Sequence, residues 1–371
     1  MKETYTISLK PKYASLVLGR DGLEKNHSGR HLDSSLRIEG ELGDDLYRKA
    51  LEIDSHLKGT KGERLAYGSR ISRHYEKSEV ENARLFRLLL WYQHGAAEEF
   101  GTWYTDEEPN PSCRMDRQEL RVVQLAPFRS TVEDKTSQVC ALSSHQVGPL
   151  HFPSSKFVKK DIFALWGGEV ILSRRLADLI ENGGFSGGKL LPIWDTWRGS
   201  QSMLDLSDCP TGNQLLARAK SIGLSPTDRQ FWVWIELEEQ LPLLEAALWE
   251  QKEIYDTRKA SKSRAQAHVQ LKVTSSKLQV AEPTISANDP FLDPAEHCDC
   301  RYGTIRRSIY SRIVVQSSSW DGSDVCETDL YLGGRVGLFR PSRALVVSKR
   351  LFDQMRQGKM KRYGFEIVEL V

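Results

Sequence analysis

The sequence lacks any hydrophobic stretch that approaches the roughly 18 consecutive apolar residues of a membrane-spanning helix. Its first residues, Met1 to Tyr5, contain no apolar signal-peptide core. We therefore expect a cytoplasmic protein with no membrane partner. The chain also lacks an excess of one charge, because 52 Lys and Arg residues are interleaved with 50 Asp and Glu residues. A nucleic-acid-binding protein would show a clustered basic excess, so we expect no nucleic-acid partner.

Cysteine is sparse and scattered. The sequence has six cysteines: Cys113, Cys140, Cys209, Cys298, Cys300 and Cys326. This distribution does not favour a disulfide framework in a reducing cytosol. With 371 residues, 39% of them hydrophobic and 27% charged, the chain is long enough for two or three soluble globular domains.

One stretch of the sequence occurs twice. Residues 169–183 and 343–358 each contain an apolar, partly β-branched run, a serine, a segment with helical periodicity and a final glycine. This order predicts a strand, a helix N-cap, a helix and a C-cap. At a fixed offset, Ile171, Leu172, Ser173, Arg174, Arg175, Leu176 and Asp178 match Val346, Val347, Ser348, Lys349, Arg350, Leu351 and Asp353.

The similarity extends to both sides of this stretch. Another apolar run follows each copy, at 190–194 and 365–370, so each copy predicts a β-α-β unit. Upstream, 161–163 matches 324–326, and 149–152 matches 312–315, with extra residues in the second copy around 330–340. We infer two diverged copies of one module, at about 140–194 and 298–371.

The sequence thus predicts an α+β protein with two related β-α-β-containing modules, an internal duplication, joined by a helical segment and preceded by an N-terminal α/β extension. The predicted division is an N-terminal extension at 1–110, a first module at 111–200, a helical and extended connector at 201–296 and a second module at 297–371.

Outside the repeated stretch, periodicity predicts a strand at 5–9 and helices at 42–57, 213–222 and 241–255. Strands are predicted at 119–124, 231–235 and 268–273. Ser78 to Glu81 has the pattern of a capping box that opens an apolar run at 83–92, for which periodicity leaves helix and strand open.

Several motifs resemble catalytic or ligand-binding sites but lack a required feature. Residues 183–189 match most of a phosphate-binding loop, yet Leu190 stands where a hydroxyl is needed, and the loop leads from helix to strand. Ser173 and Ser348 stand at strand-to-helix junctions, but neither has the flanking glycines of a nucleophile elbow. We predict that both serines are N-caps that bind the N–H groups of Leu176 and Leu351.

Charged and cysteine residues offer two further interpretations. Arg175 with Asp178, and Arg350 with Asp353, predict ion pairs three residues apart on exposed helix faces. Zinc needs about four nitrogen or sulfur ligands. The weak candidate ligands are His297, Cys298, Cys300 and Cys326, with Cys113, Cys140, His145 and His151 conceivable in the first half. The cysteine spacing is irregular, so we expect no cofactor and favour buried, unliganded cysteines.

Tryptophan is abundant, with nine residues, and several gather in the central third of the chain. Most are expected in the core, but aromatic side chains also dominate protein interfaces. The candidate partner-binding residues are Trp197, Trp232, Trp234 and Trp249.

A series of short motifs resembles the double-CXXCG-motif family of bacterial proteins, best known from myxobacteria. The motifs cover most of the chain from about residue 70 and lie at 75–86, 99–104, 145–150, 160–162, 169–173, 283–284, 289–291, 298, 320–324, 340–341 and 347–348. Members of that family have been linked to the neutralisation of toxins delivered between neighbouring cells. This chain departs from the family at both CXXCG knuckles: the first has no counterpart beyond Cys113 and Cys140, and the second is reduced to Cys298-Asp-Cys300.

The resemblance implies a non-catalytic immunity-type protein that binds and neutralises a cognate toxin. A hydrolase-like enzyme that uses the serine junctions remains an alternative. So does a scaffolding protein that binds another protein through its duplicated modules, and a zinc-dependent nucleic-acid module is a further one. The sequence leaves the oligomeric state open.

Overall fold

The computed structural model describes residues 1–19, 36–91, 97–100, 102–104, 124–126, 129–130, 145–153, 160–194, 206–226, 229–235, 237, 239–259, 268–285, 290–291, 297–300, 303–306, 311–333 and 340–371. The described residues form helices and several sheets, which confirms the predicted α+β class.

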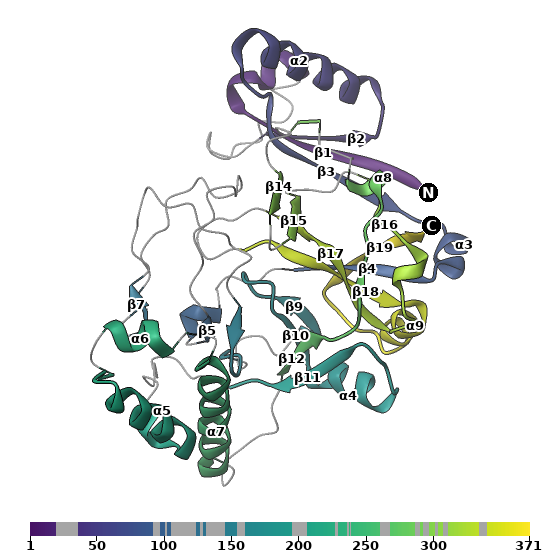
Figure 1. Cartoon of the computed structure of the whole chain (residues 1–371). Coiled ribbons are helices and arrows are strands. Elements are labelled where there is room, and N and C mark those ends of the chain that lie inside the picture. The colour runs from purple at the N-terminus through teal and green to yellow at the C-terminus, as the bar shows by residue number, and fades with distance from the viewer. Residues whose placement is uncertain are drawn as a thin grey trace.

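The N-terminal residues form a three-stranded antiparallel sheet that packs against a long helix and a shorter helical stretch at 14–19 (Figure 1). The sheet consists of β1 (Lys2–Leu9), β2 (Leu36–Glu41) and β3 (Ala66–His74), and the long helix is α2 (Asp45–Lys61). Alternate residues of β1 are buried, as period-two patterning requires. The predicted strand at 5–9 and helix at 42–57 are therefore confirmed.

A four-stranded antiparallel sheet contains the first repeated stretch. Its order is β11 (Gly188–Pro192), β12 (His268–Val273), β10 (Val170–Ser173) and β9 (Ile162–Ala164). Helix α4 (Arg174–Asn182) follows β10 directly.

Four strands around the second stretch have the same order within a larger sheet. They are β19 (Tyr363–Leu370), β4 (Leu85–Leu90), β18 (Ser342–Ser348) and β17 (Val325–Leu332), and α9 (Lys349–Gln357) follows β18. Periodicity left helix and strand open for the apolar run at 83–92, and the structure shows that this run forms the strand β4.

The two sheets have matching registers. Leu172 of β10 lies opposite Ile162, and Val347 of β18 lies opposite Val325. The matching of 161–163 with 324–326 is thus reproduced by the strand pairing. Figure 1 shows the two sheets beside each other, with α4 and α9 on the same side of the molecule. Descent from one duplicated segment stays a prediction.

One hydrophobic core, the central core, is shared by both sheets and both helices. At its centre the ring of Phe86 from β4 stacks on that of Phe352 from α9, with 3.9 Å between ring centroids. Smaller cores lie on the outer face of each sheet. Burial of this kind is the main source of folded-state stability, so the two modules are stabilised as a pair.

A helical segment lies against the strand β8 (Gln146–Val147), on the side of the molecule opposite the N-terminal unit (Figure 1). It comprises α5 (Pro210–Ser221), α6 (Arg229–Ile235) and α7 (Leu241–Lys259), which share one core with Trp103 and Val147. The predicted helices at 213–222 and 241–255 are confirmed, as is the strand at 268–273.

The prediction of a strand at 231–235 is wrong, because these residues belong to α6. Phe231 and Ile235 are both fully buried and four residues apart, so they lie on one face of a helix against the core of this segment. Helical spacing of two large apolar residues overrides the strand preference of aromatic side chains.

The capping box also differs from the prediction. Helix α3 (Lys77–Asn82) begins after Glu76, not Ser78, and the Glu76 N–H donates to Glu79 Oε2 at 2.8 Å. The box therefore lies two residues earlier than expected, and the apolar run that follows the helix is β4.

The remaining elements are short. They are the strands β5 (Trp103–Tyr104), β6 (Gln124–Ala126), β7 (Arg129–Ser130), β8 (Gln146–Val147), β13 (Lys277–Leu278), β14 (His297–Cys300), β15 (Gly303–Arg306) and β16 (Val314–Val315), the helix α8 (Glu282–Ile285), and the 3-10 turns Pro11–Tyr13, Ala97–Phe100, Leu206–Asp208 and Ser317–Ser319. The predicted strand at 119–124 lies outside the described residues except for its last residue.

Candidate functional site

The two serines at the strand-helix junctions are N-caps, as predicted. Ser173 Oγ accepts the Leu176 N–H at 3.3 Å, and Ser348 Oγ accepts the Leu351 N–H at 3.2 Å. A β-region serine can satisfy one of the free N–H groups of a helix's first turn in this way. Each hydroxyl proton is used as well, and it is donated to an aspartate.

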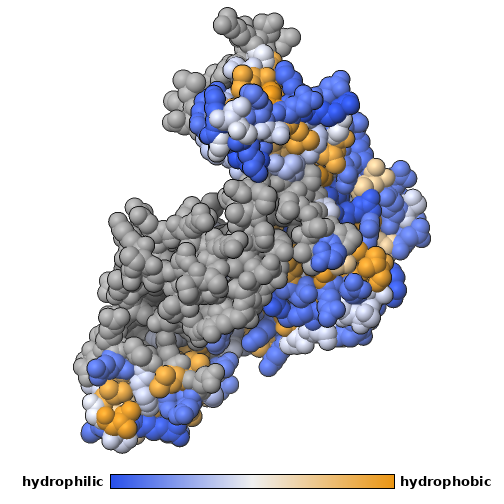
Figure 2. Space-filling model, turned by 45° about the horizontal axis from the view of Figure 1, so that its top comes forward, coloured by the Kyte–Doolittle hydropathy of each residue, from blue (hydrophilic) through white to orange (hydrophobic). Residues whose placement is uncertain are grey.

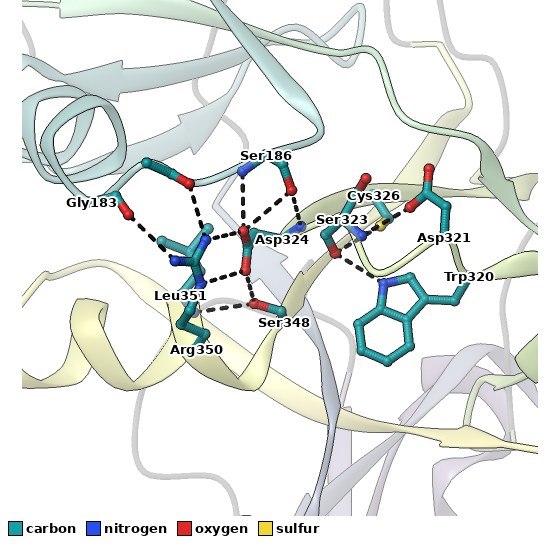
Figure 3. A network of polar contacts seen from close by, with 11 residues as sticks. Gly183, Ser186, Trp320, Asp321, Ser323, Asp324, Cys326, Ser348, Arg350 and Leu351 are labelled. Carbon is teal, nitrogen blue, oxygen red and sulfur yellow. Dashed lines mark hydrogen bonds and ion pairs between the residues drawn. The ribbon is translucent and has the colours of Figure 1, made fainter.

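The aspartate that receives the Ser348 hydroxyl is Asp324, whose side chain is 7% exposed. Ser348 donates to Oδ1 at 2.6 Å, and Arg350 Nη2 donates to Oδ2 at 2.5 Å. The N–H of Ser186 donates to Oδ2 at 3.0 Å. Figure 3 shows this carboxylate at the centre of donors from both modules.

Asp161 has the corresponding role in the first module. Ser173 Oγ donates to its Oδ1 at 2.9 Å, and Arg175 Nη2 donates to its Oδ2 at 2.6 Å. The N–H of Lys361, from the other module, donates to Oδ2 at 2.8 Å. We call the two sets, Asp161–Ser173–Arg175 and Asp324–Ser348–Arg350, the twin clamps.

The arginines of the twin clamps cross between the modules. Arg350 donates to the carbonyl of Gly184 at 3.1 Å, at the end of α4. Arg175 donates to the carbonyl of Gly358 at 3.3 Å, at the end of α9. The last carbonyls of a helix carry partial negative charge and lack partners within the helix. Each module therefore caps the helix of the other.

The predicted ion pairs of Arg175 with Asp178 and of Arg350 with Asp353 are wrong. Arg174 Nε pairs instead with Asp178 Oδ1 at 2.6 Å, four residues along the helix. Lys349 pairs with Asp353 in the same way. The next residue in each helix, Arg175 or Arg350, bonds the buried carboxylate of its own module, which is a stronger partner than a solvated one.

Hydrogen bonding keeps both clamp aspartates ionised. Burial disfavours the charged form of Asp324, but hydrogen bonds from Arg350, Ser348 and the Ser186 N–H outweigh it and lower the pKa to about 2. Burial also opposes ionisation of Asp161, and bonds from Arg175, the Lys361 N–H and Ser173 outweigh it and lower its pKa. A carboxylate of such low pKa is a poor general base near pH 7.

The glycine-rich stretch 183–189 is a helix-to-strand turn, as its position after α4 predicted. Its Ser186 N–H and hydroxyl both donate to the Asp324 carboxylate. Gly187 has φ of 89°, and a side chain there would collide with the carbonyl of Val325. The glycines thus allow the turn to approach the second module closely.

Among the cysteines that are candidate zinc ligands, the structure describes the side chain of Cys326 alone. Cys326 is buried in β17, and burial raises the pKa of its thiol to about 11. His297, Cys298 and Cys300 lie on β14, but the structure does not describe their side chains. Cys113 and Cys140 lie outside it entirely. Among the described residues, no three His, Cys, Asp or Glu side chains form a group able to hold a metal.

His151, a candidate zinc ligand by sequence, belongs to a buried group of aromatic side chains. Its ring stacks on that of Trp194, with 4.6 Å between centroids, and Trp194 lies 5.3 Å from Tyr255 of α7. Lys252 of the same helix has a side chain only 4% exposed and is paired with Asp256. Burial, together with the charge of Lys252, lowers the His151 pKa to about 4, so the ring is neutral at pH 7.

Two of the tryptophan candidates can be placed. Trp234 on α6 and Trp249 on α7 are both half-buried in the helical segment. Trp197 and the side chain of Trp232 lie outside the described residues. The same segment exposes Ile222 (58%) and Leu237 (51%). Figure 2 shows hydrophobic residues on its surface at the lower left.

Comparisons with known proteins returned no relative: no family model, no curated protein and no solved structure matches the chain. In the described part of the chain, no helix combines the length and the apolar character that a membrane crossing needs.

Proposed function

We propose that the protein is non-catalytic and acts in the bacterial cytoplasm, where it binds and neutralises a cognate protein toxin. The bonding of the twin clamps is the observation that carries the non-catalytic part. Each serine hydroxyl caps a helix and donates its proton to a carboxylate whose pKa is lowered. These groups hold the two modules together and are not arranged to activate a nucleophile.

The binding part is supported by the helical segment, residues 206–259. Exposed Ile222 and Leu237, with half-buried Trp234 and Trp249, give it the apolar and aromatic side chains that anchor protein interfaces. The core on which the segment packs is separate from the central core, so the surface of the segment can vary without disturbing the central core. Toxin as the class of partner comes from the resemblance of the short motifs alone.

The experiment is capture of the partner from the native cell lysate with the tagged protein, followed by a toxicity test. The expected partner is a protein with a toxin domain, recovered at one to one, whose expression arrests growth unless this protein is co-expressed. A recovered ratio of two partners to one chain would favour the scaffolding alternative. No partner, together with turnover in a general hydrolase screen, would refute the proposal.

Surface variants locate the interface. Leu237→Glu and Ile222→Glu should weaken capture and protection at least about tenfold, because each places a charge on the apolar contact surface. Trp91→Glu is the matched control, since Trp91 is 64% exposed at the end of β4 and outside the helical segment. Equal losses in all three variants would mean that the helical segment is not the binding surface.

A further inference from the structure

Each four-stranded sheet is completed by a strand from elsewhere in the chain. In the first sheet β12 lies between β10 and β11, although 75 residues separate the end of β11 at Pro192 from the start of β12 at His268. In the second sheet β4 lies between β18 and β19, and it comes from the N-terminal third of the chain.

The order along the chain shows a simple pattern. Of the elements that form the two sheets and their helices, the first run is β4, β9, β10, α4 and β11. The second run is β12, β17, β18, α9 and β19. Each run begins with the strand that completes the sheet of the other run. We infer that residues 85–194 and 268–370 are two interlocked halves, each of which supplies an inner strand to the other, so that neither half is a folding unit by itself.

Matching contacts outside the repeated stretch support these limits. Next to the first sheet, Thr102 Oγ1 accepts the His151 N–H at 2.9 Å, and His151 pairs in parallel with Trp194. Next to the second sheet, Thr284 Oγ1 accepts the Val314 N–H at 2.7 Å, and Val314 pairs in parallel with Glu369. The two halves therefore correspond beyond the stretch that the sequence comparison identified.

The physical consequence is coupled opening. Removing an inner strand leaves the facing N–H and C=O groups of two strands without partners, which is costly away from water. Loss of β4 would open the second half, and the second half supplies β12 to the first. The twin clamps add a further link, since each arginine bonds the carbonyls of the other half.

Native-state hydrogen exchange on the full-length protein tests this inference. Leu85→Ala in β4 removes a fully buried side chain from the outer core of the second half. It should speed the slowest amide exchange roughly 30-fold or more in β17–β19 and, by the same factor, in β9–β12 of the first half. Leu85→Val, which should give about a fivefold change, covers the case in which the alanine variant does not fold.

Ile7→Ala is the matched control, because Ile7 is equally buried and lies in the same predicted N-terminal extension, but packs on α2. It should speed exchange in β1–β3 only. In the first sheet, Leu271→Ala in the inner strand β12 should speed amide exchange in both halves. Leu215→Ala in α5 should speed amide exchange in the helical segment. Acceleration confined to one half by Leu85→Ala, or equal acceleration of all strands by Ile7→Ala, would overturn the inference.

Discussion

The inner faces of the two modules are alike, whereas their surroundings differ. Ser173 and Ser348 have the same bonds, and so do Asp161 and Asp324. Among the described residues, by contrast, the helical segment lies between β11 and β12, and the β14–β15 hairpin pairs with β17, whereas β6 and β7 pair with each other.

This difference separates scaffold from specificity. Positions that occur in both modules bond the modules to each other, so their chemistry is accounted for by the fold. Parts that occur once cannot be explained by the shared scaffold, and they are where a specific partner surface is expected. The comparison therefore directs attention to residues 206–259 and away from the serines.

The largest difference between the modules inside the central core is the size of one side chain. Phe352 of α9 corresponds to Ala177 of α4, and its ring stacks on Phe86. Phe352→Ala should cost about 3–5 kcal/mol, because it leaves a cavity between the modules. Ala177→Gly, at the matching position, should cost only about 1 kcal/mol. Denaturant unfolding followed by two probes, one in each module, measures both, and separate transitions would contradict a shared core.

A second difference lies at a titrating position, since His151 corresponds to Val314. The His151 pKa is about 4 in the folded chain, below its ordinary value of 6.5. Between these values the unfolded chain binds more protons, so stability should fall as the pH falls, by up to roughly 3 kcal/mol. His151→Val should remove this fall. Urea unfolding at pH 7 and pH 4.5 measures it, and an unchanged pH dependence would show that burial of the ring is not its source.

The third prediction compares the aspartates of the twin clamps, Asp324 and Asp161. Asp324→Asn should cost about 2 kcal/mol at pH 7, and Asp161→Asn somewhat less, because the Asp324 pKa is lowered to about 2. The stability contributed by the charged Asp324 is present above pH 3.8 and is lost as the pH falls through 2, so the two proteins should converge there. Thermal unfolding across this range measures the effect.

Asp178→Asn is the matched control for the clamps, because Asp178 pairs with Arg174 on an exposed helix face. A surface pair of this kind contributes little, so the change should be below about 0.5 kcal/mol. A loss from Asp178→Asn as large as that from Asp324→Asn would mean that the crossing arginines do not set the strength of the clamps.

Local features were predictable from the sequence because their causes lie within a few residues. The N-caps at Ser173 and Ser348 depend on a hydroxyl and an N–H three residues later, and helices α4 and α9 depend on apolar spacing. The glycine-rich turn was predictable for the same reason. Where the competing signal came from a distant core, as for α6, local propensity gave the wrong answer.

The amino-acid sequence by itself determined the α+β class, the two strand-helix units and the caps that begin their helices. Only the tertiary structure decided that Arg175 and Arg350 bond the other module rather than Asp178 and Asp353, and that β4 and β12 each enter a sheet built largely by the other half. The physical reason is range: a strand's partners and a buried carboxylate's donors are set by long-range packing, which no short window of sequence contains.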